Sequence, residues 1–301
     1  MSKNLVNKYV WLVETIYKEG EISLEDLNKK WLDSGLSEGV DISKRTFHKW
    51  KKIIEEMFGI LIDCERKGGY HYYISNREEL KGSGLRNWLL STLSVSNILM
   101  EHKQLHQRIL TEEIPSNREH LAEILDAMNH NSVISITYQS FWKDQANTFE
   151  IQPYCVKMFK QRWYLVAYSP GDDSLRIYAL DRIIDTDITE RSFQMPENFD
   201  PAGFFKDYYG VIANTDTPLE TVRLKVEAGQ ANYLRSLPLH HSQKEVENSS
   251  EYCIFELSLR PEFDFMMELL SMGASVEVLS PIWLRDEMKE QAKRLCKNHK
   301  R

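Results

Sequence analysis

Cysteine is scarce in this chain of 301 residues, which holds four cysteines and no Cys-x-x-Cys pair. They are Cys64, Cys155, Cys253 and Cys296. Because they lie far apart in the sequence, they indicate neither a zinc site nor a disulfide framework. No apolar run reaches the roughly 18 residues that a membrane-spanning helix needs, and the N-terminal residues lack the apolar core of a signal peptide. We therefore expect a cytoplasmic protein that does not associate with a membrane.

Signatures of catalysis are also scarce. The sequence has no GxxxxGK[ST] phosphate loop, no HExxH motif and no GxGxxG dinucleotide fingerprint. His102 and His106 are four residues apart on an expected helix, but no third metal ligand follows nearby. We interpret them as exposed histidines, and His240-His241 as a pair in a loop. The sequence therefore predicts a binding protein rather than an enzyme, with no cofactor and no metal.

Charge is unevenly distributed. The 45 acidic residues outnumber the 38 basic ones and give a net charge of -7, which argues against a chain that coats nucleic acid along its whole length. From Lys44 to Lys52, however, there are five basic residues and no acidic one. A basic patch confined to one segment of an acidic protein is typical of a local DNA-reading surface. A solvated helix face with no partner is the alternative.

Hydrophobic periodicity predicts three helices and a hairpin in residues 1–76, which is the order of a winged helix-turn-helix. The hairpin tip is the basic segment Arg66-Lys67-Gly68-Gly69. A loop at residues 33–41 is longer than the turn in the simplest form of this fold. The helices are expected over 4–19, from Ser23 to about Leu32, and from a Ser43 cap onward, and the strands over 60–65 and 70–74.

The third of these helices is expected to expose basic residues opposite its buried Phe47 and Trp50. Residues near the N-terminal end of such a helix read bases, and arginine makes bidentate bonds to guanine, so Arg45 is the predicted base contact. The surrounding cations would hold phosphates. A helix-turn-helix reused for protein contacts is the alternative. The predicted DNA-binding residues are Lys44, Arg45, His48, Lys49, Lys52 and Lys67.

The centre of the chain is rich in β-branched and aromatic residues. Arg162-Trp163-Tyr164-Leu165-Val166-Ala167-Tyr168 is followed by a turn and then by Leu175 to Leu180 and Asp181-Arg182-Ile183. Trp-Tyr-Leu with a downstream Leu-Asp-Arg-Ile resembles the signature of the WYL domain, a small Sm-like β-barrel that senses ligands in bacterial transcription regulators. Further on, Gly273 to Pro281 with Leu284-Arg285 resembles the WCX extension that commonly follows it.

The resemblance implies a multidomain α+β protein. Ile42 to Phe47 with the later Gly-Gly-Tyr is similar to the winged helix-turn-helix domains that usually precede WYL domains. The expected domains are a DNA-binding winged helix-turn-helix over 1–76, a helical connector over 77–131, the WYL Sm-like β-barrel over 132–193, a second connector over 194–219 and a ferredoxin-like α/β WCX domain over 220–301.

A cationic pocket with aromatic walls is predicted in the WYL domain. Strand alternation places Arg176 and Tyr178 on one face, which Arg182 shares if the strand continues. The alternative is that Arg182 pairs with Asp181 or Asp185 and only stabilises the barrel, and a purely structural role is likewise the alternative for each of the other arginines. Over an extended strand Arg176 and Arg182 would lie roughly 20 Å apart. The predicted ligand-binding residues are Tyr138, Lys157, Arg162, Arg176, Tyr178 and Arg182.

Such a pocket suits phosphates together with stacked bases, and the family resemblance also implies a nucleotide or oligonucleotide-like ligand. Phe149 stands where many family members carry arginine, whereas Trp163 and Leu165 are expected in the core. We therefore expect a homodimeric regulator that binds a double-stranded DNA operator and responds to this ligand. The alternative is a nucleic-acid-binding accessory factor, for example in phage defence, that regulates no promoter. A nucleotide-processing enzyme is less favoured.

Overall fold

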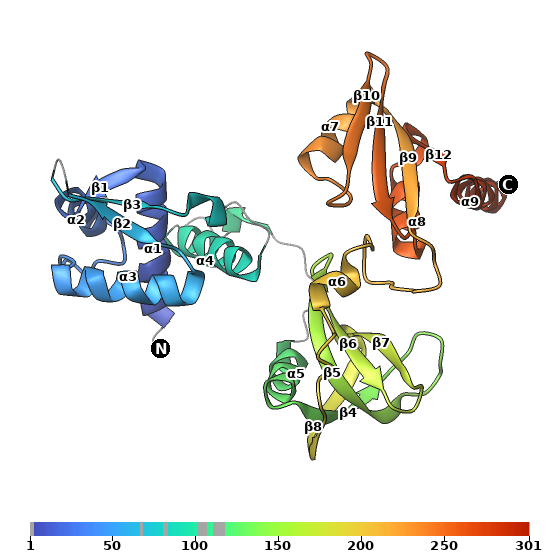
Figure 1. Ribbon diagram of the computed structural model, residues 1–301, viewed down its shortest axis with the longest axis horizontal. Coiled ribbons are helices and arrows are strands. Elements are labelled where there is room, and N and C mark those ends of the chain that lie inside the picture. The colour runs from blue at the N-terminus through green and yellow to red at the C-terminus, as the bar shows by residue number, and fades with distance from the viewer. Residues whose placement is uncertain (1–2, 67–68, 81–83, 102–106, 111–117, 301) are drawn as a thin grey trace. The chain divides into compact units, whose positions relative to one another are not determined.

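The computed structural model describes residues 3–66, 69–80, 84–101, 107–110 and 118–300, which fall into two compact units, 1–112 and 113–301 (Figure 1). Helices alternate with three antiparallel sheets along the chain. Within the described ranges, no helix has both the length and the apolar character needed to cross a membrane.

The first unit begins with three helices and a small antiparallel sheet of order β1-β3-β2. The sequence predicted two of these strands, and the third, β1, is a three-residue strand that pairs with β3. Ser23 and Ser43 cap their helices as predicted, each accepting a hydrogen bond of 3.1 Å from a backbone amide three residues on. The elements are α1 (Lys3–Glu19), β1 (Glu21–Ser23), α2 (Leu24–Asp33), α3 (Lys44–Phe58), β2 (Ile62–Glu65) and β3 (His71–Ile74).

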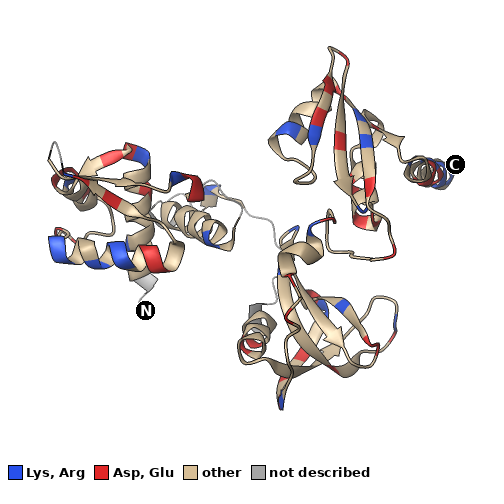
Figure 2. Cartoon of the chain, in the orientation of Figure 1, with Lys and Arg blue, Asp and Glu red and all other residues tan. Residues whose placement is uncertain are grey.

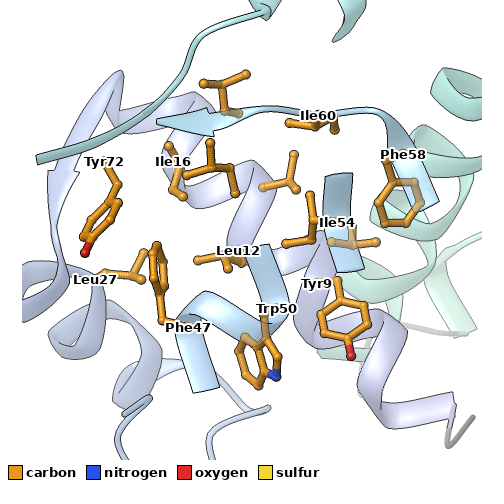
Figure 3. Close-up of a cluster of buried hydrophobic side chains, with 14 of the residues drawn as sticks. Tyr9, Leu12, Ile16, Leu27, Phe47, Trp50, Ile54, Phe58, Ile60 and Tyr72 are labelled. Atoms are coloured by element: carbon orange, nitrogen blue, oxygen red, sulfur yellow. The ribbon is translucent and has the colours of Figure 1, made fainter. Parts of the chain in front are cut away.

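One face of α3 is buried in the core of this unit. Phe47 and Trp50 point from α3 into a cluster that includes Tyr9 of α1, whose ring lies 5.9 Å from that of Trp50 (Figure 3). Ile54 and Phe58 continue the same face toward the C-terminal end of the helix. Because these apolar side chains fix the rotation of α3 about its axis, its polar positions must point to solvent.

The predicted helical connector contributes helices to both units. In the first unit, η1 (Arg77–Leu80) and α4 (Leu85–Glu101) follow the sheet, and Asn97 of α4 donates a hydrogen bond of 3.2 Å to the Asn7 carbonyl of α1. In the second unit, α5 (Arg118–His130) packs through Ile124 and Ala127 against the central sheet. The sequence also predicts breaks in this connector near Gly82-Ser83-Gly84 and at Pro115, and these positions fall mostly outside the described residues.

The central sheet of the second unit is antiparallel and has the strand order β7-β6-β5-β4-β8. The sequence pattern predicts two strands here, over 150–154 and 156–159, whereas the structure has one 13-residue strand, β5, with a bulge between Pro153 and Cys155. Among the described residues β7 and β8 are not paired with each other, so the predicted barrel is not observed as a closed sheet. The strands are β4 (Ser132–Tyr138), β5 (Asn147–Phe159), β6 (Arg162–Ser169), β7 (Ser174–Ala179) and β8 (Ile183–Ser192).

The Trp-Tyr-Leu segment lies on β6 in the middle of this sheet. Leu165 is completely buried in the core cluster, and Trp163 is partly buried against it. Both residues therefore occupy the core, as the sequence indicated. β7 does not continue to Arg182, because the chain leaves it at Ala179 and turns through the 3-10 helix η3 (Leu180–Arg182).

The C-terminal part follows α6 (Pro201–Phe205) and has the element order β-α-β-β-α-β, with a sheet of order β10-β11-β9-β12. This order is that of the predicted ferredoxin-like fold. Strand β10 escaped prediction because all five of its residues are exposed and three are charged. The elements are β9 (Glu220–Glu227), α7 (Ala228–Ser236), β10 (Lys244–Asn248), β11 (Tyr252–Leu259), α8 (Phe263–Ser271), η4 (Gly273–Ser275), β12 (Val276–Ser280) and α9 (Ile282–Asn298).

Candidate nucleic-acid interface and ligand cavity

The N-terminal half of α3 presents cations to solvent. Lys44, Arg45, His48 and Lys49 are all exposed, opposite the buried Phe47, and Lys and Arg positions recur along this helix (Figure 2). The first turn holds no acidic residue, so the positive end of the helix dipole adds to these charges. The result is a surface that attracts phosphate groups.

The cations toward the C-terminal half of α3 contact carboxylates instead. Lys52 lies 3.7 Å from Glu56, and Lys51 lies 4.0 Å from Asp63. In the described part of the chain Lys44, Arg45 and Lys49 form no ion pair. The predicted phosphate contact Lys67 lies outside the described residues. Among the described residues of α3, the cations without a carboxylate partner therefore lie toward its N-terminal end, which is the end predicted to read bases.

The loop between α2 and α3 is anchored rather than open. The side chain of Asn28 accepts a hydrogen bond of 2.8 Å from the amide of Ile42 and donates one of 3.2 Å to its carbonyl. Trp31 donates from Nε1 to the Val40 carbonyl at 2.8 Å. The inserted residues thus leave α3 fixed against α2.

This loop also holds a Gly-x-Ser-x-Gly match, at residues 35–39, that the sequence analysis missed. Its serine, Ser37, is buried, and its hydroxyl lies 3.2 Å from both the Leu32 and the Ser34 carbonyl oxygens. The loop joins two helices, whereas a nucleophile elbow joins a strand to a helix and exposes its serine. Ser37 therefore has the buried, hydrogen-bonded position of a structural serine and not the exposed position of a nucleophile.

In the second unit, a cavity of about 900 Å³ opens beside the central sheet. Tyr178 of β7 is buried in its wall, with its ring 5.3 Å from that of Tyr138 and 5.6 Å from that of Phe149. Burial raises the pKa of Tyr178, so its hydroxyl keeps its proton and can donate a hydrogen bond. Phe149 makes this wall more aromatic and less charged than an arginine at the same position would.

Arg176 and Arg182 both line this cavity, although an extended strand would have separated them. The turn through η3 brings Arg182 back toward β7. The Nε of Arg176 lies 3.3 Å from Asp172, whereas the guanidinium carbon of Arg182 lies 3.9 Å from the ring centre of Phe141. Arg182 forms no ion pair with Asp181 or Asp185 in the described residues, and its buried Nε has no partner there.

A second cavity of about 520 Å³ shares Tyr138, Arg176 and Arg182 with the first. Its lining includes Asp264 of α8, so the C-terminal domain contributes to the site. The Oδ2 of Asp264 accepts hydrogen bonds of 2.7 and 3.0 Å from the amides of Val211 and Ile212. No spacing in the sequence connects this aspartate with the arginines, because only folding brings α8 to them.

Two of the predicted ligand residues are engaged elsewhere. Arg162 lies 3.3 Å from Asp181, as in the alternative that the sequence left open. Lys157 donates a hydrogen bond of 2.6 Å to the Gly210 carbonyl and lies 4.0 Å from the ring centre of Phe205. Burial lowers the pKa of Lys157 to about 8. Neither side chain lines the two cavities.

In the described part of the chain, no cluster of three or more His, Cys, Asp or Glu residues could hold a metal ion. His102 and His106 lie outside that part. His240 is buried in its loop, with Nε2 2.8 Å from the Lys206 carbonyl oxygen and Nδ1 2.7 Å from the Ser242 hydroxyl. These contacts give it a role in holding the loop.

Two family models match the second unit. The model of the WYL domain matches residues 119–188, and that of the WCX domain matches residues 218–296. The first range contains the Trp-Tyr-Leu segment, Arg176 and Arg182, and the second contains Asp264. The larger cavity is thus built from the first matched region alone, whereas the smaller one also includes Asp264 of the second and residues 211–213 between the two.

Individual relatives and solved structures match this chain at low sequence identity. The protein PafB of Mycobacterium tuberculosis is 26% identical over 171 residues, 56% of this chain and 50% of that protein. The HTH-type transcriptional regulator YobV of Bacillus subtilis is 26% identical over 182 residues, 60% of this chain and 55% of that protein. The chain spans about half the length of the curated relatives it matches.

Among solved structures, the proteasome accessory factor B/C (PafBC) of Arthrobacter aurescens aligns with 95% of this chain and 45% of its own, at 19% identity and a TM-score of 0.37. A CRISPR Cas-related protein aligns with 84% of this chain and 73% of its own, at 13% identity and a TM-score of 0.38.

Proposed function

This chain belongs to the WYL-domain family and carries a WCX domain after the WYL domain, and we propose that it is a DNA-binding transcriptional regulator. The observation that carries the proposal is the set of exposed cations, Lys44, Arg45 and Lys49, at the capped N-terminal end of α3. The relative YobV, named an HTH-type transcriptional regulator, supports the same function.

DNA binding would use the first unit as a winged helix-turn-helix. In this arrangement α3 enters the major groove, where Arg45 contacts a guanine and Lys44, His48, Lys49 and Lys52 hold the backbone. The hairpin of β2 and β3 acts as the wing, and Lys67, which lies between these two strands in the sequence, would add a phosphate contact. Support comes from the burial of Phe47 and Trp50, which leaves the basic side of α3 free for DNA.

The second unit would sense an anionic ligand that also carries aromatic rings, such as a nucleotide or an oligonucleotide. Arg176 and Arg182 suit phosphate because guanidinium groups bind it through paired, charge-assisted hydrogen bonds. Tyr138, Phe149 and Tyr178 supply rings on which bases can stack. We propose that the curved five-stranded sheet is an open form of the Sm-like barrel and that β7 and η3 form its sensing edge.

Regulation would follow from linkage in a homodimer. Two copies of α3 in a symmetric dimer read half-sites about one helical turn of DNA, or a multiple of it, apart. A ligand that binds more tightly to one placement of the two DNA-binding units shifts the population toward it, and DNA affinity changes by the same coupling free energy. This mechanism requires no catalysis, so we propose a binding protein rather than an enzyme.

Footprinting tests the proposal directly. The full-length protein should protect a two-fold symmetric site in the DNA upstream of its own gene, and a cell extract containing the ligand should change the protection. Protection of no promoter, together with tight binding to unrelated nucleic acid, would favour the accessory factor. Turnover of any member of a nucleotide panel would refute the absence of catalysis.

Sedimentation velocity tests the dimer. We expect a dimer at micromolar concentration that binds one operator duplex. A monomer both with and without the duplex would contradict the symmetric reading of two half-sites, while leaving binding to a single half-site possible.

A further inference from the structure

One edge of β7 has no neighbouring strand among the described residues. The strand pairs with β6 and ends the strand order of the central sheet (Figure 1). The amide of its last residue, Ala179, donates to the Tyr138 hydroxyl at 3.4 Å and therefore points away from β6. Because backbone groups alternate in direction along a strand, the amides of Leu175 and Ile177 point the same way. Such a row of backbone donors and acceptors is a template for pairing with another chain.

The two cavities lie along this edge, one toward each face of β7. Leu175, Ile177 and Ala179 share a face, and all three line the smaller cavity. Tyr178, on the opposite face, lines only the larger one, whereas Arg176 and Ile177 reach both. An extended chain beside β7 thus places its alternate side chains in different cavities.

The smaller cavity is mostly apolar. Its volume of about 520 Å³ lies within the roughly 300–1,000 Å³ typical of ligand pockets. The carboxylate of Asp264 also lines it, but the amides of Val211 and Ile212 already donate to its Oδ2. The apolar residues that line it besides those of β7 are Phe159, Val211, Ile212 and Ala213. This cavity therefore suits apolar side chains.

The larger cavity is cationic. Its basic lining residues are Lys143, Arg176 and Arg182. Its two acidic lining residues already have partners, because Glu150 contacts Arg191 and Asp172 contacts Arg176. The Asp172 carboxylate lies 3.3 Å from Nε of Arg176, which shows that this guanidinium can receive a carboxylate at the cavity. This cavity therefore suits acidic side chains.

We propose that the free edge of β7 binds an extended segment of a partner protein in which acidic and apolar residues alternate. The segment adds a sixth strand to the central sheet, its carboxylates contact Arg176 and Arg182, and its apolar side chains enter the smaller cavity. Carboxylates suit these arginines because guanidinium groups bind them through paired, charge-assisted hydrogen bonds. The inference goes beyond the proposed function, since it adds a protein partner that competes with the anionic ligand for both arginines.

The test measures binding of a labelled heptapeptide to the full-length protein by fluorescence anisotropy. The peptide alternates glutamate with valine, and its ends are acetylated and amidated. One comparison peptide has lysine in place of glutamate, and another has the same composition arranged in two blocks. The alternating acidic peptide should bind at least about tenfold more tightly than either, because only it matches both cavities. Equal affinity of the block peptide would overturn the proposal, because net charge alone would then explain binding.

Methylation of the peptide amides tests strand pairing without changing any charge. The amides that point to β7 are those of the valines if the added strand is antiparallel, and those of the glutamates if it is parallel. Methylation of one set should therefore abolish binding, while methylation of the other set should preserve affinity to within about threefold. Retention of binding by both methylated peptides would exclude strand pairing.

Variants of β7 test the same contacts from the protein side. Ile177→Pro removes an outward amide but no bond to β6, so the protein should stay folded and lose at least about tenfold in peptide affinity. Ile177→Ala keeps the amide and is the matched control, with an expected loss of no more than about fivefold. Arg176→Glu should reverse the preference, so that the lysine peptide binds better. If Ile177→Pro fails to fold, this reversal and the methylated peptides still decide.

The remaining outcomes separate this inference from the proposed function and from self-association. Binding of the peptide but not of thymidine 5′-monophosphate would support the docking edge and refute the nucleotide ligand. Binding of the nucleotide but of no peptide would refute only the docking edge. If the wild type sediments as a dimer and Ile177→Pro as a monomer, a second copy of the chain occupies the edge, which would overturn the proposal.

Discussion

The cations of α3 and those of the cavity differ in what they contact. On α3, Lys44, Arg45 and Lys49 point to solvent and form no ion pair in the described part of the chain. In the cavity, Arg176 is already held by Asp172 and Arg182 lies against Phe141. Both surfaces are positively charged, but in the cavity Arg176 must give up its contact with Asp172 before it can bind a ligand through the same atoms.

This difference fits two separate tasks. A surface of unpaired cations attracts any phosphate backbone by releasing counterions, and its affinity falls steeply with salt. A paired arginine must exchange its carboxylate for the ligand, so the protein with and without ligand differs in its internal contacts. Such a difference is what couples a binding site to a conformational equilibrium. We therefore expect α3 to provide affinity and the cavity to provide regulation.

The largest effect is expected from the double change Arg45→Ala and Lys49→Ala. Removing a base contact and a phosphate contact should weaken operator binding by about 100-fold and lower the salt slope by about 1 to 2. Fluorescence anisotropy with the operator duplex at several salt concentrations measures both quantities.

Lys52→Ala is the matched control, because Glu56 lies 3.7 Å from this lysine and already neutralises part of its charge. Its effect should be severalfold smaller. If the double variant binds the operator normally, α3 is not the DNA-reading helix and the contrast between the two surfaces disappears.

Arg182→Ala is expected to have the next largest effect, on ligand binding alone. Loss of charge-assisted hydrogen bonds should weaken ligand binding by about 10- to 100-fold. Arg182→Lys should already reduce the ligand affinity, because lysine cannot bind phosphate bidentately. Operator binding without ligand should be unchanged. Ligand titrations of the operator complex measure both.

Arg162→Ala sharpens this test. Arg162 pairs with Asp181 outside both cavities, so its loss should lower the stability of the second unit and leave the ligand response intact. If Arg182→Ala unfolds the unit while Arg162→Ala abolishes the response, the roles of the two arginines are reversed.

The surface of α3 could be predicted well from sequence because a single helix carries it. Local periodicity placed Phe47 and Trp50 inside, and a helix with one buried face must turn its other residues outward. The sequence pattern likewise predicts a strand over Tyr252–Leu259 and a helix over Phe263–Ser271, which are the spans of β11 and α8. It missed β1 and β10, whose three and five residues are too short and too polar to show a pattern.

The cavity was predicted only in part, because it depends on contacts between distant segments. Strand alternation gave Arg176 and Tyr178, but it could not foresee that η3 would bring Arg182 beside them. It also assigned Lys157 to the ligand, whereas the fold directs this side chain to the Gly210 carbonyl. Asp264 became part of the site only through packing of the C-terminal domain.

Trp163→Phe should have a smaller effect, and one that leaves both surfaces unchanged. Trp163 packs against the core of the central sheet and lines neither cavity. The smaller ring should lower the free energy of unfolding by about 1 to 2 kcal/mol without altering operator or ligand affinity. Urea denaturation followed by circular dichroism measures the change, and a lost ligand response in a stable variant would place this residue in the site.

The smallest effect concerns Lys157, a third kind of cation that is buried. Burial lowers its pKa from 10.5 to about 8, so between these values the unfolded chain holds a proton that the folded chain has lost. Stability rises with pH wherever the unfolded state binds more protons. Relative to Lys157→Met, the wild-type free energy of unfolding should therefore increase between pH 7 and pH 9.5, by an amount of the order of 1 kcal/mol. Urea titrations of both proteins at intervals of half a pH unit measure this difference in the free energy of unfolding. Contributions from the titration of other groups are common to both proteins and cancel in it. A difference that stays flat or falls would mean that Lys157 keeps a solvated ammonium group, and would make it available to an anionic ligand after all.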